Sequence, residues 1–532
     1  MKLKDKLSVL GIAFAVQISG FAQTGNHSAI ATSHPEAKKA ASGILAQGGN
    51  AVDAGVAALL TLAVAQTGSV GVAGYGGSLI IYSAKDKKVY AVDFDTKLPE
   101  NYDLNNFNEK DATIGYKAVS VPGVVSGLYT ALKNHGTLSW KQVSQHAYNL
   151  AENGIVVDER LHRSLTGFTQ IADAVSLKAY LPAGLPEVGS IWKQKDLAKV
   201  IKAIGEKGPD AFYKGKLAKK IAKHVQANGG YLSEKDLNTY QAQELEPIKI
   251  SYRGYEIYAP PVPSAGITSL SILKTLENFN LQKVRPFSAE YFNLFAQASK
   301  LTWQERFRFL GDPDFVNVPT QELLSDKAGK ERAEKILHDD VVPLNAGVSD
   351  PLHTTNVVVI DKAQNIISIT ATQGNGYGSG VVVPGTGLVF GHGLSRFDYK
   401  PGAPNYPAPG KRVQHNMTPT LVLYNGEPYA GLGLPGGRYI VTVTSQLLID
   451  ILDYHLSPKQ AIEAPRIHNE GDDTVKIFGE VSDADIKDLE LKGFKIDKVR
   501  GLGGPANIAV IDRKTGKIDA ASQAGDAGVE IK

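Results

Sequence analysis

A hydrophobic and polar pattern typical of a β-hairpin runs through the second half of the chain. Residues 357–360 form an apolar run, residues 361–365 are polar and turn-forming, and residues 366–372 alternate between apolar and polar side chains. Two such runs joined by a short polar segment predict two antiparallel strands. The hairpin folds Thr372 back toward Thr354, so the pattern predicts two neighbouring threonine hydroxyls.

Helical patterns dominate the first part of the chain. Residues 36–65 are rich in alanine and interrupted by a glycine pair, which predicts two helices joined at that pair. Residues 79–82 and 89–94 predict strands, whereas residues 137–310 predict mainly helices. Residues 354–532 are richer in Val, Ile, Gly and Pro, which predicts a part dominated by strands.

Thr354 is a candidate nucleophile, although no base residue stands beside it. A threonine hydroxyl is a weak nucleophile and needs a general base. Cleavage of the peptide bond between His353 and Thr354 would free an α-amine, whose pKa of about 8 suits that task. The alternative is that Thr354 and Thr355 are ordinary strand residues, because threonine favours strands.

A second chemical feature is the segment 433–438, which contains the adjacent glycines Gly436 and Gly437. Glycine lets backbone N–H groups approach a ligand closely. Such groups commonly form the oxyanion hole of acyl-transfer enzymes. The alternative is that this segment is only a turn.

Six short motifs follow one another along the chain. They are residues 48–54, 71–77, 121–127, 252–255, 311–315 and 434–437. In this order they resemble the γ-glutamyltranspeptidase family, which are self-processing N-terminal-nucleophile hydrolases that hydrolyse or transfer γ-glutamyl amides such as glutathione. The resemblance covers nearly all of the chain after the first two dozen residues.

The resemblance implies an α/β (α+β) fold, a four-layer αββα sandwich built from two subunits of one precursor. It implies cleavage between His353 and Thr354. Residues 24–353 would form the large subunit and residues 354–532 the small, catalytic subunit, with both subunits in one compact domain.

The resemblance also implies the roles of the catalytic residues. Thr354 attacks the substrate amide, Thr372 supports this nucleophile, and the N–H groups around Gly436 and Gly437 stabilise the oxyanion. Water or an amine then releases the acyl group, by hydrolysis or by transpeptidation.

The residues that would bind the substrate depart from the family pattern. The family has an arginine for the α-carboxylate where this chain has Asp95, and an aspartate for the α-amino group where it has Arg396. An asparagine, a glutamine and a serine pair of the family are also replaced. The predicted substrate-binding positions are Asp95, Gly374, Arg396, His415 and Asn416, and Gly393 stands in the place of the glutamine.

The exchanged charges at Asp95 and Arg396 have two interpretations. A γ-glutamyl donor in the usual orientation would meet like charges at both positions, which is costly in a poorly solvated pocket. Arg396 would then bind the carboxylate of a different acyl group, as a dicarboxylic monoamide presents, because a guanidinium matches a carboxylate. Alternatively, Asp95 and Arg396 pair with each other and fill the pocket. His415 is either a ligand donor or a polar wall of the pocket.

A short, proline-rich connection, residues 400–410, stands where many family members carry a long loop over the site. This departure predicts a substrate groove that is open to solvent. An open groove favours hydrolysis and tolerates bulky leaving groups.

Composition excludes several classes of site. A formal charge of +3 over 532 residues does not favour nucleic-acid binding, and the lack of cysteine excludes disulfides and thiolate chemistry. No metal or organic cofactor is implied, because the chain has neither a His-Glu-x-x-His helix nor a phosphate loop in its strand-to-helix context. The predicted partners are an amide or peptide substrate and a water or amine acceptor.

The N-terminus has the pattern of a secretory signal peptide over residues 1–23. Three early lysines precede a short apolar stretch that ends in small residues. About 15 apolar residues are too few to span a bilayer. The mature protein is therefore predicted to be periplasmic or secreted, without a stable membrane anchor.

Three functions remain open from the sequence. The first is a γ-glutamyl hydrolase or transferase that acts on glutathione-like donors. The second is an amidase or acylase with the same machinery but another carboxylate-bearing acyl group, as in the cephalosporin acylases and oxamate amidohydrolases of this family. The third is a non-catalytic binding protein, against which the retention of Thr354, Thr372, Gly436 and Gly437 argues.

Overall fold

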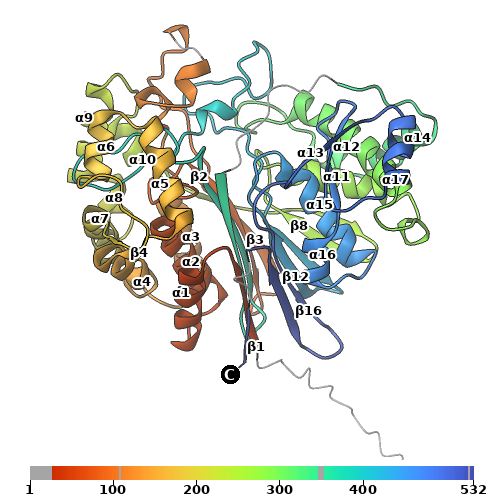
Figure 1. Ribbon diagram of the computed structural model, residues 1–532, viewed down its shortest axis with the longest axis horizontal. Helices are drawn as coiled ribbons and strands as arrows, with labels where there is room; N and C mark the ends of the chain where they lie inside the picture. The colour runs from red at the N-terminus through yellow and green to blue at the C-terminus, as the bar shows by residue number, and fades with distance from the viewer. Residues whose placement is uncertain (1–26, 107–108, 345–352, 525–527, 532) are drawn as a thin grey trace, which may run out of the picture.

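The computed structural model describes residues 27–106, 109–344, 353–524 and 528–531. Two large sheets stack face to face, and helices cover both outer faces (Figure 1). This arrangement confirms the predicted four-layer αββα sandwich of the N-terminal-nucleophile hydrolases. The predicted signal sequence, residues 1–23, lies outside the described residues, as do residues 345–352 just before the predicted cleavage site.

The first sheet has seven strands, and each strand runs antiparallel to its neighbours. In spatial order they are β18 (Gly528–Ile531), β1 (His27–Thr32), β9 (His353–Ile360), β10 (Ile366–Gly374), β2 (Gly76–Ser83), β3 (Lys88–Asp93) and β6 (Gln243–Leu245). The predicted hairpin is β9 and β10, and the two predicted early strands are β2 and β3. Strands from both sides of the predicted cleavage site therefore form one sheet.

The second sheet has six antiparallel strands. In spatial order they are β17 (Ile518–Ser522), β16 (Asn507–Ile511), β12 (Glu427–Gly433), β11 (Thr420–Tyr424), β8 (Tyr255–Ala259) and β7 (Ile248–Tyr252). Strands β7 and β8 come from the region 137–310, where the sequence pattern predicted mainly helices. That prediction missed them because their short runs sit between long helical segments.

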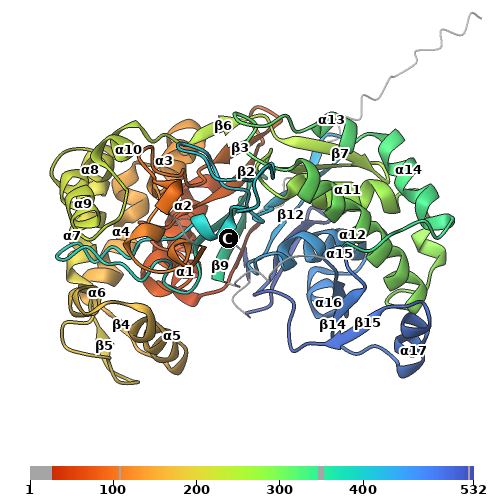
Figure 2. The same ribbon diagram turned by 90° about the horizontal axis from the view of Figure 1, so that it is seen from above.

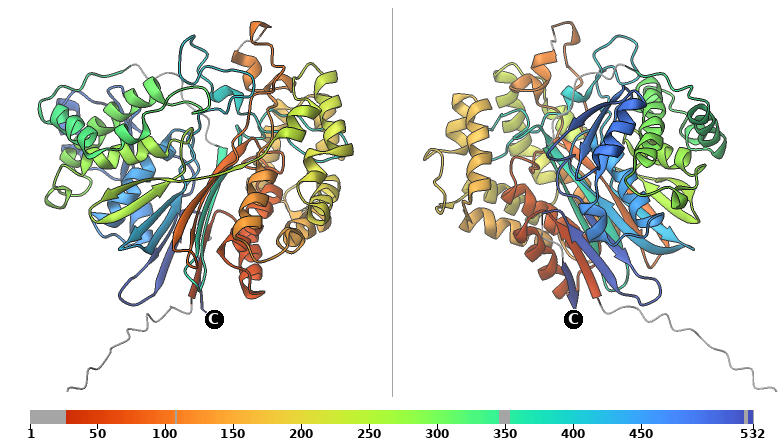
Figure 3. Two further views of the ribbon diagram at one scale, coloured as in Figure 1. Left: turned by 180° about the vertical axis from the view of Figure 1, so that it is seen from behind. Right: turned by 45° about the vertical axis from the view of Figure 1, so that its right-hand side comes forward.

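The helices form the two outer layers (Figures 2 and 3). Those on the side of the first sheet are α1 (Pro35–Ala46), α2 (Ala51–Ala65), α3 (Val124–His135), α4 (Trp140–Asn153), α5 (Glu159–Ile171), α6 (Ala174–Tyr180), α7 (Lys195–Lys207), α8 (Asp210–Tyr213), α9 (Gly215–Ala227) and α10 (Glu234–Thr239). Those on the side of the second sheet are α11 (Gly266–Leu276), α12 (Ala289–Phe309), α13 (Thr320–Leu323), α14 (Asp326–Leu337), α15 (Tyr439–Leu452), α16 (Pro458–Glu463) and α17 (Asp483–Leu491).

Two small sheets complete the fold. β4 (Ile155–Val156) pairs with β5 (Ile191–Trp192), and β14 (Thr474–Phe478) lies between β13 (Arg466–His468) and β15 (Lys495–Lys498). Helices α1 and α2 confirm the two-helix prediction. The second begins at Asn50, whose side chain accepts hydrogen bonds from Val52 and Asp53 and so caps the helix.

The inner faces of the two sheets share an apolar core. Ile80 and Val358 of the first sheet belong to one cluster with Leu421 and Ile511 of the second. Helices cover the outer faces, so β9 and β10 are buried on both sides. Burial on both sides explains the continuous apolar run 357–360 in β9. Among the described helices, none combines the length and the apolar character needed to cross a membrane.

Candidate active site

The hairpin of β9 and β10 brings Thr354 and Thr372 together, as the sequence pattern predicted. The Thr354 hydroxyl donates a long hydrogen bond of 3.3 Å to the Thr372 hydroxyl. Thr372 in turn donates to the carbonyl oxygen of His353 and accepts a hydrogen bond of 2.9 Å from the N–H of Gly374. Both threonines are buried. A chain of two hydroxyls thus leads from Thr354 to the peptide carbonyl that precedes it.

An irregularity in the ladder accompanies this contact. Opposite Thr354, strand β10 contributes two residues, Thr372 and Gln373, where a regular ladder would place one. A bulge of this kind bends a strand and redirects side chains, and bulges are frequent beside active sites. The regular register already places Thr372 opposite Thr354, and the extra residue shifts the pairing beyond it, so that Gly374 pairs with His353.

Asn356 anchors the start of β9 and was not predicted from the sequence. Its fully buried amide donates 2.9 Å and 3.0 Å hydrogen bonds to the Ile369 carbonyl and the Thr370 hydroxyl. Asn507, on β16 of the second sheet, donates a 3.0 Å hydrogen bond to the Asn356 carbonyl. These bonds tie the strand that carries Thr354 to both sheets.

The glycine pair Gly436–Gly437 lies in the loop between β12 and α15. The two residues have φ values of +141° and +57°, a region that glycine adopts readily. The loop starts beside β9, because a Cβ on Gly433 would lie 2.2 Å from Nδ2 of Asn356. The N-terminus of α15 follows at Tyr439 and adds partial positive charge. The loop thus provides backbone donors of the kind that stabilise an oxyanion.

Asp95 is buried beside the same strand ends. A Cβ on Gly76 would lie 2.8 Å from the Asp95 Cα, and Gly76 pairs with Thr372 in the ladder. Among the described residues, no side chain donates a hydrogen bond to either carboxylate oxygen of Asp95, whereas the backbone N–H of Thr96 favours its charged form. Burial, together with the charge of Asp93, raises the pKa of the Asp95 carboxyl well above its usual range.

Asp95 and Arg396 do not hydrogen-bond each other, which is the contact that the pairing interpretation requires. Arg396 hydrogen-bonds the phenol of Tyr75 instead. The turn that carries Arg396 packs tightly, since a Cβ on Gly393 would lie 2.3 Å from Thr96. Tyr75 belongs to the glycine-rich motif 71–77 and escaped the sequence analysis, which considered only its glycines.

Gly374 is a glycine for a steric reason. Its φ is +95°, and a Cβ would lie 2.3 Å from the carbonyl oxygen of His392 and 2.8 Å from atoms of the His392 ring. His392 is fully buried; its Nε2 accepts from the N–H of Asn375 at 2.7 Å and its Nδ1 lies 3.0 Å from the Ser395 hydroxyl. The imidazole of His392 therefore occupies the space that an asparagine at position 374 would need.

His415 and Asn416 lie behind the same strand ends. Nδ1 of His415 accepts from the N–H of Met417 at 3.2 Å, so its proton is on Nε2, which lies 3.3 Å from the Ser78 hydroxyl. Burial and three neighbouring arginines lower the pKa of His415 to about 3. Asn416 accepts a 2.6 Å hydrogen bond from Arg306. His415 is thus neutral, and the backbone of Met417 and the hydroxyl of Ser78 hold its ring in place. These contacts favour the interpretation of His415 as a polar wall of the pocket.

The connection 400–410 is held close to the body of the protein. Lys411 donates to the carbonyl oxygens of Pro404 and Tyr406 at 2.7 Å and 2.9 Å, and the N–H of Gly410 donates to Leu98. The segment is short, as its sequence indicates. That the substrate groove is open to solvent stays a prediction.

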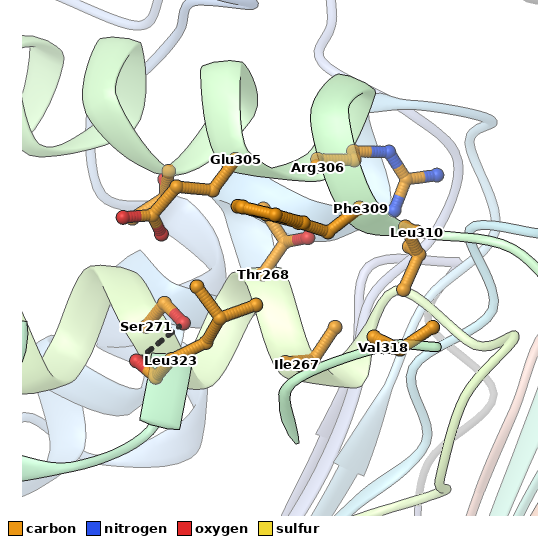
Figure 4. A pocket seen from close by; sticks show the side chains of 10 residues that line it. Ile267, Thr268, Ser271, Glu305, Arg306, Phe309, Leu310, Val318 and Leu323 are labelled. Carbon is orange, nitrogen blue, oxygen red and sulfur yellow. Dashed lines mark hydrogen bonds between the residues drawn. The ribbon is translucent and has the colours of Figure 1, made fainter. Parts of the chain in front are cut away.

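A small pocket lies between α11 and α12 (Figure 4). Its volume of about 10 Å³ leaves room for about one water molecule, so it is too small for an acyl group. The guanidinium of Arg306 extends toward Leu310, at the end of the pocket away from Ser271 and Leu323. Arg306 therefore points out of this pocket and toward Asn416.

Comparisons with known proteins agree with this geometry. The family described as Gamma-glutamyltranspeptidase matches residues 37–531. The chain is 34% identical over 498 residues to the glutathione hydrolase proenzyme of Escherichia coli (strain K12), covering 88% of this chain and 85% of that protein. It is also 34% identical over 503 residues to the acylase ACY 1 proenzyme of Pseudomonas sp. (strain SE83), covering 91% and 90%.

The fold is similar to that of a solved acylase. The crystal structure of cephalosporin acylase from Bacillus halodurans matches with a TM-score of 0.86 and 25% identity, covering 95% of both chains. Both the sequence and the fold relatives are enzymes by name. The chain therefore belongs to the γ-glutamyltranspeptidase family and is an amidohydrolase of the N-terminal-nucleophile type.

Proposed function

We propose that the chain is a self-processing amidohydrolase or acyltransferase whose nucleophile is Thr354. The observation that carries this proposal is the hydroxyl chain from Thr354 through Thr372 to the carbonyl oxygen of His353. Names of relatives that include the word proenzyme support cleavage of a precursor. The proposed products are residues 24–353 and 354–532, and they share both sheets.

In the uncut chain, the Thr354 hydroxyl attacks the carbonyl carbon of His353. The C–N bond between the two residues breaks, the nitrogen takes up the proton, and an ester joins His353 to the Thr354 oxygen. Water then hydrolyses this ester, which frees the Thr354 hydroxyl and leaves a carboxylate on His353. Thr372 assists by donating to the carbonyl oxygen that becomes the oxyanion.

In the processed enzyme, the α-amine of Thr354 acts as the general base for its own hydroxyl. The hydroxyl attacks the substrate amide, the N–H groups of Gly436 and Gly437 stabilise the oxyanion, and the protonated amine leaves. Water or a second amine then attacks the acyl-enzyme and restores the hydroxyl. Asn356 holds the strand that carries the nucleophile in place.

The acyl donor has two candidate classes. The names of glutathione hydrolase relatives favour γ-glutamyl amides. The carboxylate of Asp95, which no described side chain hydrogen-bonds, favours the second class, a different carboxylate-bearing acyl group, because Asp95 would repel the α-carboxylate of a glutamyl donor. In this second class Arg396 would bind the donor carboxylate, because a guanidinium matches a carboxylate.

The location follows from the N-terminal pattern, and we propose a periplasmic or secreted enzyme with residues 1–23 removed. An exported enzyme would meet amides and peptides from outside the cell. The short segment 400–410 supports hydrolysis of donors with bulky leaving groups.

The intact mass of the purified protein after incubation tests the proposal. A fragment that begins at Thr354, present in the wild type and absent in Thr354→Ala, is expected. A folded wild-type chain that stays uncut would exclude a working nucleophile. Turnover of γ-glutamyl-p-nitroanilide compared with its deamino analogue, glutaryl-p-nitroanilide, then separates the two donor classes.

A further inference from the structure

Arg306, on α12, is a buried cation that forms no ion pair within the described part of the chain, although the charge of Glu470 acts on it. Its side chain is 6% exposed, its Nη2 donates to Asn416, and its Nη1 has no hydrogen-bond partner. Burial, together with the charge of Arg438, lowers the pKa of Arg306 to about 9, so the group remains charged at neutral pH. A buried charge is costly unless an opposite charge compensates it.

Two nearby arginines, Arg412 and Arg438, differ from Arg306 because each forms at least one ion pair. Arg412 forms ion pairs with Asp93, Asp312 and Asp314 at 2.7–3.0 Å. Arg438 forms an ion pair of 2.7 Å with Glu470. Arg412 and Arg438 are thus paired with carboxylates, whereas the only side-chain hydrogen bond of Arg306 to a described residue goes to the neutral amide of Asn416.

Arg306 and Arg438 lie against the same ring. Their guanidinium carbons are 5.2 Å and 5.9 Å from the ring centre of Trp303, which is fully buried. Stacking on an aromatic face restrains a guanidinium and leaves its edge available for hydrogen bonds. The two groups therefore form a rigid, positively charged pair.

This pair adjoins the acyl pocket. Arg438 directly follows Gly437 in the loop that provides the oxyanion donors. Arg306 bonds Asn416, one of the predicted substrate-binding positions, and its charge is among those that lower the pKa of His415. Arg306 thus places a buried positive charge beside a predicted substrate-binding position.

We propose that Arg306, assisted by Arg438, binds a carboxylate of the substrate and so determines its specificity. Carboxylate is the fitting chemistry, because its two oxygens match the donors of a guanidinium. The carboxylate comes either from the far end of the acyl group or from the leaving group. This inference rests on the proposed function, since it assigns a substrate to the same site.

Three anilide donors distinguish the two sources in the processed enzyme. Glutaryl-p-nitroanilide carries a carboxylate only on the acyl side, butyryl-4-aminobenzoate only on the leaving side, and butyryl-p-nitroanilide has none. Arg306→Met should raise KM about 10- to 100-fold for the donor whose carboxylate it binds and leave the neutral donor unchanged. Arg306→Lys should restore part of the affinity, and Arg308→Met, which removes an exposed charge from the same helix, is the matched control.

A binding measurement keeps this test separate from catalysis. Titration with glutarate and with 4-aminobenzoate, followed by the fluorescence of Trp303, should saturate in the wild type and weaken by a similar factor in Arg306→Met. Trp140→Phe and Trp192→Phe remove the other two tryptophans from the signal. If Arg306→Met does not fold, as judged by its melting curve, Arg306→Lys replaces it in both measurements.

The outcomes of the two proposals differ. Equal KM values for wild type and Arg306 variants with all three donors, together with equal carboxylate titrations, would overturn the role of Arg306. An uncut chain without turnover would overturn the proposed function, while the titrations would still decide whether Arg306 binds carboxylate.

Discussion

The hydroxyl of Thr372 donates a hydrogen bond to the carbonyl oxygen of His353, the group on the acyl side of the predicted cleavage site. The same hydroxyl accepts from the N–H of Gly374 and from the hydroxyl of Thr354. One side chain therefore polarises the carbonyl and contacts the nucleophile. From this dual position we propose that Thr372 acts in processing as well as in turnover.

Thr372→Val should slow self-cleavage about 10²- to 10³-fold, the usual effect of losing one oxyanion donor. The measurement is a time course of the fragment that begins at Thr354, followed by intact mass. Thr444→Val is the matched control, because Thr444 is fully buried and its hydroxyl has no hydrogen-bond partner. Cleavage of both variants at the wild-type rate would refute the role of Thr372.

Gly374→Asn, which restores the family residue, should destabilise this protein by about 1–3 kcal/mol, the usual cost of overpacking. The new Cβ would lie 2.3 Å from the backbone carbonyl of His392, which cannot move as a side chain can. Urea unfolding provides the measurement. Gly402→Asn is the control, since Gly402 has a similar φ of +85° but nothing within 4 Å of its Cβ position. Equal midpoints for the two variants would contradict the steric explanation.

Asp95→Asn should stabilise the protein at pH 7 by about 1–3 kcal/mol, because it removes a buried carboxylate that no described side chain hydrogen-bonds. The pKa of Asp95 is raised in the folded state, so the unfolded chain loses the proton first as the pH rises, and this favours unfolding. The stabilisation by Asp95→Asn should therefore vanish as the pH falls toward 4, where the carboxyl is protonated in both states. Unfolding at both pH values gives the measurement.

The matched variant Asp312→Asn should instead destabilise the folded protein. Asp312 is equally buried but accepts two hydrogen bonds from the guanidinium of Arg412 and one from its N–H. Removal of one partner of a buried ion pair is strongly destabilising. If Asp312→Asn stabilised the protein, or Asp95→Asn destabilised it, the assignment of Asp95 as an unpaired carboxylate and Asp312 as an ion-paired one would be wrong.

Acid should destabilise the protein through His415. The folded pKa is lowered to about 3, whereas the unfolded value is about 6.5, so the unfolded chain binds the proton first. Stability should therefore fall as the pH drops from 6.5 toward 3, by up to about 1.4 kcal/mol per unit.

The check is the dependence of the unfolding midpoint on pH, which should be flatter in His415→Gln. His338→Gln, at an exposed position, is the control and should keep the wild-type slope. Parallel curves for His415→Gln and the wild type would show that His415 does not titrate on unfolding as proposed.

Local patterns predicted the parts of the site that lie close together in the sequence. Strands β9 and β10 are joined by a five-residue turn, so the alternation of apolar and polar residues was sufficient to place Thr372 opposite Thr354. The helix pair α1 and α2 follows from the alanine-rich segment and its glycine interruption. The ordered motifs identified the family, because they span nearly the whole chain.

Only the tertiary structure decided which charges and polar groups meet. Arg306 and Asn416 are 110 residues apart, and Asn356 and Asn507 are 151 residues apart, so their contacts depend on how helices and sheets pack. No sequence pattern reveals that Arg396 bonds Tyr75 while no described side chain hydrogen-bonds the Asp95 carboxylate.

The sequence by itself thus determined the hairpin, the candidate nucleophile and the family, because periodicity and short motifs are local properties of the chain. The surroundings of the predicted substrate-binding positions, including the buried charge of Arg306 and the space that His392 takes beside Gly374, came from packing. Packing joins side chains that no local signal connects, since burial and close approach arise only when distant elements fold against each other.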